Sequence, residues 1–105
     1  MSDVQYLGSI TQRVSEVIAY TVDVSLVTAA PTYSTVILKD VTNPSSISDV
    51  SSTKLSGSGS ASGTTLTSPF VTTLVDGHTY RLIYRYTGSG NTWENYGDII
   101  CKQEG

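Results

Sequence analysis

The chain has few of the residues on which metal proteins and secreted disulfide scaffolds depend. Among 105 residues it contains one cysteine, Cys101, and one histidine, His78. A single cysteine cannot close an internal disulfide, and one cysteine with one histidine cannot supply the four ligands of a structural zinc site. Packing must therefore hold the fold together, and we expect no metal and no cofactor.

Charge and long apolar runs are also scarce. Charged residues make up 14% of the chain and the net charge is −3, so there is no basic surface for nucleic acid or for an anionic membrane. The first twenty residues contain Asp3, Arg13 and Glu16 and no unbroken apolar run. We therefore expect neither a signal peptide nor a transmembrane helix, and synthesis in the cytoplasm of the producing cell.

What the chain does have is an abundance of serine and threonine with scattered β-branched and aromatic residues. This composition favours strands and turns over solvated helices. A length of 105 residues suits one domain with one core. The composition predicts a single all-β domain.

The clearest pattern lies in residues 74–86. Tyr80, Leu82, Tyr84 and Tyr86 alternate with more polar residues, which is typical of a half-buried strand. Arg81 and Arg85 fall on its other face, where they can pair with carboxylates across the sheet or contact a partner.

The approach to this strand carries a second pattern. Leu74, Gly77 and Tyr80 have the spacing of the tyrosine corner, in which a buried tyrosine hydroxyl bonds to backbone a few residues upstream. This spacing resembles the corner of immunoglobulin-like and fibronectin type III sandwiches.

Further alternation and turn residues predict the other strands. We expect them at 18–26, 34–41, 64–73 and 92–101, with a weaker one at 48–55 and with the Gly/Ser run 56–63 as the mobile turn of a hairpin. Pro69 indicates an edge strand or a bulge. Six or seven strands at this rhythm predict an antiparallel two-sheet β-sandwich of the immunoglobulin-like or fibronectin type III-like kind, with a small barrel as the alternative.

The N-terminal segment is polar and only weakly patterned. We assign residues 1–13 to an extended arm and residues 14–105 to the sandwich domain. Tyr6, Leu7 and Ile10 are candidate contacts with this domain or with a neighbour, while a frayed terminus is an equal alternative.

No residue pattern defines a reaction. His78 has no identifiable nucleophile or orienting acid, and a turn-exposed histidine is the simpler interpretation. The aspartates do not form a calcium-loop pattern. Trp93 and Tyr96, with Tyr84 and Tyr86, could form a platform for sugar rings, although the alternation favours core positions for Tyr84 and Tyr86. We predict that the protein is not an enzyme.

Three segments resemble small immunoglobulin-like structural proteins of tailed bacteriophages. They are residues 13–25, with the pattern Tyr-x-hydrophobic-Asp-x-Ser, residues 76–80, which enter the penultimate strand, and residues 87–100, a Gly/Ser hairpin with a last strand. The group usually has a proline near Ser15 and more glycine before the tyrosine, and this chain departs from both features.

This resemblance implies a non-enzymatic virion protein, made in the host cytoplasm. It would be a capsid decoration, head-tail or fibre-associated component. Its partners would be other virion proteins or further copies of itself, contacted through edge strands, the N-terminal arm and the Gly/Ser loops. The alternative is a carbohydrate-binding or adhesion module that uses the surface of Trp93 and Tyr96.

Overall fold

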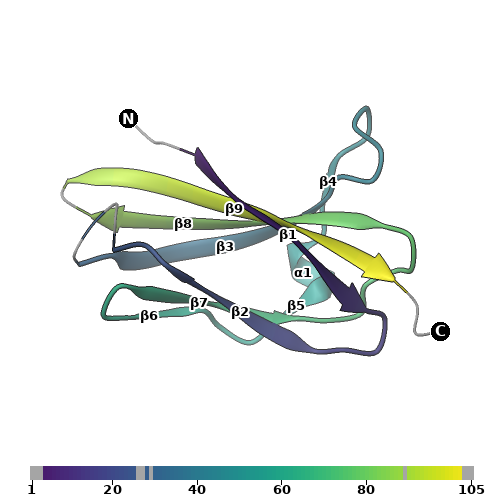
Figure 1. The fold of residues 1–105 in the computed structure, drawn as a ribbon, viewed down its shortest axis with the longest axis horizontal. Helices are drawn as coiled ribbons and strands as arrows, with labels where there is room; N and C mark the ends of the chain where they lie inside the picture. Colours follow the sequence, from purple (N-terminus) through teal and green to yellow (C-terminus); the bar gives the residue numbers. More distant parts are fainter. Residues whose placement is uncertain (1–3, 26–27, 29, 89, 103–105) are drawn as a thin grey trace.

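The computed structural model describes residues 4–25, 28, 30–88 and 90–102, with residues 4–7 described by their backbone. These residues form two β-sheets that pack as two layers (Figure 1). The expected all-β fold is confirmed. The one helix in the described part of the chain, α1 (Ser51–Lys54), is a single turn, so no helix there is long and apolar enough to cross a membrane.

The larger sheet has five strands in the order β1-β9-β8-β3-β4. Its members are β1 (Val4–Arg13), β3 (Thr32–Asp40), β4 (Ser48–Asp49), β8 (Thr79–Gly88) and β9 (Asn91–Lys102). The smaller sheet has the order β2-β7-β5 and contains β2 (Ile18–Asp23), β5 (Leu55–Ser56) and β7 (Thr65–Val71), with β6 (Ser60–Ser62) also paired to β7. The six strands of six or more residues supply most of both layers.

Strand β8 is the centre of the larger sheet, as its alternation predicts. Its burial alternates along the strand, and Tyr80, Leu82, Tyr84 and Tyr86 point into the core between the layers. They pack there with side chains from both sheets and the loops, namely Val24, Val36, Leu38, Leu66, Val71, Leu74, Ile99 and Cys101. A two-layer core built on this strand follows from the period-2 pattern.

Every buried side-chain nitrogen and oxygen in the described residues has a hydrogen-bond partner. The core tyrosines show how this is achieved. The Tyr84 hydroxyl donates to the backbone oxygen of Tyr20 at 2.8 Å, and the Tyr86 hydroxyl donates to Asn95 Oδ1. Because Tyr20 belongs to the smaller sheet, the bond from Tyr84 ties the two layers together.

The turn before β8 has the geometry that the Leu74, Gly77 and Tyr80 spacing predicts. Tyr80 and Leu74 are buried, and the Tyr80 hydroxyl accepts a hydrogen bond from the backbone N–H of Val75 at 3.0 Å. Gly77 has φ +83°, a conformation that favours glycine, and its N–H donates to the Cys101 carbonyl at 3.0 Å. The turn is thereby fixed both to the tyrosine and to the end of β9.

The Tyr80 hydroxyl gives a first testable prediction. Tyr80→Phe should lower the free energy of unfolding by about 1–2 kcal/mol, because the Val75 N–H loses its acceptor while the ring stays packed. Urea denaturation of both proteins measures the difference. An unchanged unfolding midpoint would show that the hydroxyl contributes nothing to this turn.

Residues 48–56 differ from the expected strand over 48–55. They form two short strands, β4 and β5, separated by α1. Asp49 accepts a hydrogen bond from the Ser51 N–H at 2.9 Å, and Ser51 Oγ accepts one from the Leu38 N–H at 2.8 Å. Side chains thus bond to backbone groups that would pair with backbone in a continuous strand. The hydrogen-bond ladder between the strands is interrupted as a result.

The N-terminal segment, expected as an extended arm that docks on this domain or on a neighbour, lies on this domain. From Val4 to Arg13 it is strand β1, which pairs with β9 in parallel. The larger sheet is therefore mixed rather than purely antiparallel. Residues 1–3 of the expected arm lie outside the described residues.

The Gly/Ser run is likewise more ordered than a plain hairpin turn. Residues 60–62 form β6, which pairs with β7. Pro69 lies in β7 next to an irregularity in its pairing with β2, and there the Tyr20 N–H donates to Ser68 Oγ at 2.9 Å. The bulge expected at this proline is present, because proline has no N–H to give to the ladder.

Candidate functional site

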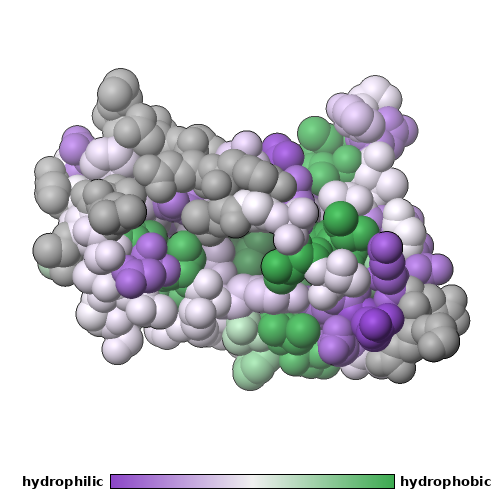
Figure 2. Space-filling view, viewed as in Figure 1, coloured by the Kyte–Doolittle hydropathy of each residue, from purple (hydrophilic) through white to green (hydrophobic). Residues whose placement is uncertain are grey.

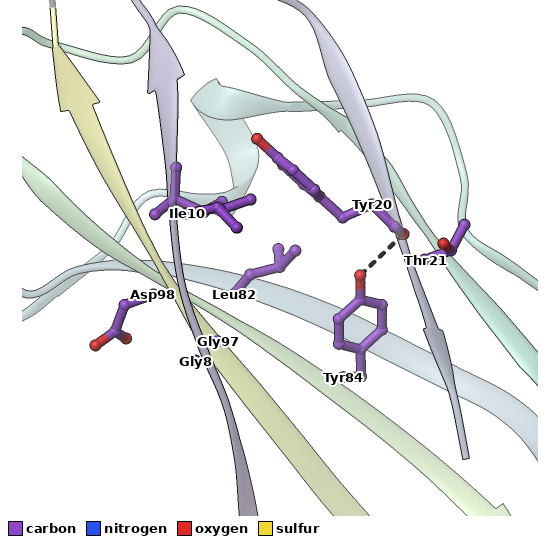
Figure 3. A pocket seen from close by; sticks show the side chains of 9 residues that line it. Gly8, Ile10, Tyr20, Thr21, Leu82, Tyr84, Gly97 and Asp98 are labelled. Carbon is purple, nitrogen blue, oxygen red and sulfur yellow. Dashed lines mark hydrogen bonds between the residues drawn. The ribbon is translucent and has the colours of Figure 1, made fainter. Parts of the chain in front are cut away.

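The described residues contain a small pocket at the open side of the two layers, between the edge strands β1 and β2 (Figure 3). We call it the edge pocket. Its volume is about 170 Å³, and it is lined by Gly8, Ile10, Tyr20, Thr21, Leu82, Tyr84, Gly97, Asp98 and Ile99. In the space-filling view, hydrophobic residues gather near the middle of this side of the molecule (Figure 2).

Two glycines explain why there is space here. Gly97 pairs with Leu82, whose side chain points inward, so the position facing the pocket has no side chain. Opposite Gly97, the pairing of β1 with β9 shifts between Tyr6 and Ser9, and Gly8 has φ +99° at this irregularity. A bulge at an edge strand beside a glycine leaves a gap in the layer.

Gln12 is fully buried and is bonded to Tyr20, one of the residues that line the edge pocket. Its side-chain Nε2 donates to the backbone oxygens of Glu16 and Val71, both at 2.9 Å, and its Oε1 accepts from the Tyr20 hydroxyl at 2.6 Å. One side chain of β1 therefore bonds to the β1–β2 turn and to both long strands of the smaller sheet. Sequence reasoning missed this residue, because glutamine at an edge strand usually faces water.

Three polar side chains that line the edge pocket, those of Tyr20, Tyr84 and Asp98, are bonded within the fold. The Tyr84 and Tyr20 hydroxyls are bonded as described, and Asp98 pairs with Arg81 at 2.9 Å. Ligand sites usually measure about 300–1,000 Å³, so this pocket suits at most one aliphatic side chain.

Burial of the tyrosines gives a pH-dependent prediction. Burial, and then the Glu16 carboxylate, raises the pKa of Tyr20 to about 12, and burial also raises the pKa values of Tyr80, Tyr84 and Tyr86. The folded state therefore favours the neutral phenols. Their contribution to stability is complete below pH ~10, the ordinary tyrosine pKa, and is lost as pH rises toward 12.

We expect the free energy of unfolding to fall between pH 10 and 12, together with a rise in tyrosinate absorbance. Tyr20→Phe serves as the control, since it removes one of these ionisations and should make the fall shallower. Stability that stays constant up to pH 12 would contradict the prediction.

The second candidate surface is the outer face of the larger sheet, which we call the three-row face. The register of β3, β8 and β9 places its side chains in three rows across the strands. The first row is Lys39, Arg81, Asp98; the second is Ile37, Ile83, Tyr96; the third is Thr35, Arg85, Glu94. A central apolar row is thus flanked by two charged rows.

Both charged rows contain an ion pair within the chain. Arg81 Nε lies 2.9 Å from Asp98 Oδ1, and Arg85 Nε lies 2.6 Å from Glu94 Oε2. Arg81 also lies over the Tyr96 ring, 4.5 Å from its centroid. The expected cross-sheet pairing of the two arginines is present. Their carboxylate partners could not be identified from the sequence, because this requires the strand register.

The candidate contacts of the N-terminal segment are placed by their strand. Tyr6 pairs with Tyr96 in register, and Leu7 lies in the irregular stretch that follows, but their side chains lie outside the described residues. Ile10 is paired with Ile99 and remains 46% exposed at the rim of the edge pocket. Of the three, Ile10 is the one with a described side chain that a partner can reach.

His78 lies in the turn before β8 and bonds to a carboxylate. Its Nδ1 is 2.7 Å from Asp40 Oδ2, while Thr42 donates through Oγ1 to Asp40 Oδ1 at 2.6 Å. Partial burial acts to raise the pKa of Asp40, but the hydrogen bonds from Thr42 and His78 outweigh it and lower this pKa. The pair joins the end of β3 to the start of β8, which is a structural role.

The aromatic platform is not assembled. Trp93 is paired with Tyr86 on the inner face, packs against the core and donates through Nε1 to the Gly88 carbonyl at 3.1 Å. Tyr84 and Tyr86 are buried, and Tyr96 lies on the opposite, outer face. These residues therefore do not present a common surface to a sugar.

Cys101 and the acidic residues add no further site. Cys101 is buried, and burial raises the pKa of its thiol, so it packs as a small apolar side chain. The described residues contain no group of three or more histidine, cysteine or acidic side chains placed to hold a metal ion.

Comparison with known proteins does not assign the chain to a family. No family model, no curated protein and no solved structure matches it. Its function must therefore be argued from its own residues.

Proposed function

We propose that this chain is a non-enzymatic structural protein of a tailed-phage virion, an immunoglobulin-like sandwich that acts through protein–protein contacts. The contact role is supported by the different positions of two sets of side chains. Interior polar groups such as Gln12, Tyr20 and Tyr84 are used to hold the layers together. The ordered charged and apolar rows of the three-row face lie on the outside.

Strand order supports the immunoglobulin-like assignment. Strands β3, β8 and β9 correspond in order and pairing to C, F and G of that fold, and β2, β7 and β5 correspond to B, E and D. Strand β4 has the position of C′ in the variable type. One departure from the constant-type order is that the first strand pairs with the last, G, rather than with B.

The virion assignment rests on the resemblance of residues 13–25, 76–80 and 87–100 to phage proteins. These segments contain β2 with the turn before it, the tyrosine turn, and the β8–β9 hairpin. All three are framework positions, so the resemblance supports a shared scaffold and, through it, a shared role.

Mass spectrometry of purified phage particles tests this proposal. Particles made by the phage that encodes this sequence should contain its peptides in a fixed ratio to the major capsid protein. Particles washed at high salt and purified through two gradients exclude a loosely adhering contaminant. Absence of the chain from such particles would overturn the virion role.

A further inference from the structure

We propose that the three-row face packs against the same face of a second copy of this chain, about a two-fold axis that runs along the strands between β8 and β9. This inference rests on the proposed function, in which the chain acts through protein–protein contacts. It adds one partner and the surface that this partner contacts.

Charge placement selects this axis. A two-fold axis along the strands exchanges β8 with β9, so Arg81 faces Asp98 of the second copy and Arg85 faces Glu94 of the second copy. A two-fold axis across the strands through the middle row would instead place Arg81 over Arg85 of the second copy. The first arrangement sets opposite charges together at all four positions of the two ion pairs, whereas the second sets like charges together.

The exposure of the four side chains fits this exchange. The arginine side chains are 38% and 41% exposed, and their carboxylate partners are 18% and 19% exposed. The arginines are the more accessible members of both pairs, so they can reach a second carboxylate while keeping the first. Because the four charges of the Arg81–Asp98 and Arg85–Glu94 pairs already have partners within their own chain, closing the interface leaves none of these four isolated.

The middle row supplies the apolar contact. Ile83 and Tyr96 are directly paired, so the same axis places Ile83 of one copy over Tyr96 of the other. Aligned sheets that pack face to face interlock side chains from such rows. A partner without this pattern would not place an apolar row against Ile83 and Tyr96 with opposite charges facing each other on both sides.

The size of the face sets the expected affinity. Three strands about 4.8 Å apart and three rows about 7 Å apart cover on the order of 300 Å². This is less than half of the ~800 Å² that each partner buries in a standard interface. We therefore expect a weak dimer, with a Kd of roughly 10 µM to 1 mM, that many copies held together in an assembly would strengthen.

Sedimentation equilibrium of the purified chain up to about 1 mM, in the Kd range estimated from the interface size, tests the proposal. The wild type should show a reversible monomer–dimer equilibrium. The acidic-face variant R81E/R85E and the basic-face variant E94R/D98R should each self-associate at least about a hundredfold more weakly, because like charges meet. A 1:1 mixture of the two variants should again form a dimer.

A third variant, R81D/R85E/E94R/D98R, guards against misfolding because it exchanges both ion pairs and keeps them within the chain. It should dimerise like the wild type but should not form a mixed dimer with it. A monomeric wild type at 1 mM overturns the proposal. So does a stronger dimer for Arg85→Glu alone, since only the axis across the strands predicts that result.

These outcomes are separable from those for the virion role. A chain that is present in particles but stays monomeric keeps the proposed function and loses this inference. A chain that dimerises through the three-row face but is absent from particles does the reverse.

Discussion

Gln12→Glu should lower the free energy of unfolding by about 3–5 kcal/mol at pH 7, because it buries an unpaired carboxylate. The side chain at this position is fully buried and gives two hydrogen bonds to the backbone oxygens of Glu16 and Val71. A carboxylate has no proton to give to either oxygen. Domains of this size are stable by only about 5–15 kcal/mol, so this one change should remove a large part of the total.

The pH dependence of this variant separates charge from packing. Burial raises the pKa of the introduced carboxyl above the ordinary ~4.3, so the penalty is absent below that pH and grows as pH rises through the folded pKa. Once protonated, the carboxyl can donate to Val71 and accept from Tyr20. Gln12→Leu offers neither bond and introduces no ionisable group.

We therefore expect the two variants to exchange order. Gln12→Glu should be the less stable at pH 7 and the more stable near pH 4, each measured by urea denaturation as a difference from wild type at the same pH. If Gln12→Glu stays the less stable at pH 4, the buried hydrogen bonds to Gln12 do not govern this position.

The centre of the larger sheet could be predicted from the sequence because its signal is local. Alternation in residues 80–86 gives the inner face of β8, and the spacing of Leu74, Gly77 and Tyr80 matches the observed turn. Both patterns arise within a dozen residues, where side-chain period and backbone conformation decide the structure.

The edges of the sheets could not be predicted in the same way. Strand β1 exists because β9 offers it a parallel partner that is more than eighty residues away in the sequence, and its own alternation is weak. Residues 48–63 divide into β4, α1, β5 and β6 through hydrogen bonds such as that between Ser51 and Leu38. Serine and threonine permit several local structures, so long-range contacts choose among them.

The candidate surfaces, too, could be predicted only in part from the sequence. The outward position of Arg81 and Arg85 follows from alternation, but their partners Asp98 and Glu94 follow from the β8–β9 register. From the sequence alone, Gly97 indicates a bulge in β9. The structure places the irregularity in β1, opposite Gly97, and thereby creates the edge pocket.

Leu66→Ala should lower the free energy of unfolding by about 3–5 kcal/mol through loss of buried contacts and the cavity left behind. Leu66 is fully buried on β7, the central strand of the smaller sheet, where β2 and β6 both pair with it. Hydrogen exchange of the β2 and β6 amides should rise with the loss of stability, because those strands depend on β7 for their pairing.

Phe70→Ala on the same strand is the matched control. It removes a larger side chain, but Phe70 is 51% exposed, so much less apolar surface returns to water and no enclosed cavity forms. We expect a loss of about 1 kcal/mol or less by the same denaturation measurement. If the two substitutions proved equally destabilising, the side chain of Phe70 would have to be covered in solution, and self-association through the smaller sheet would then compete with the two-fold contact proposed for the three-row face.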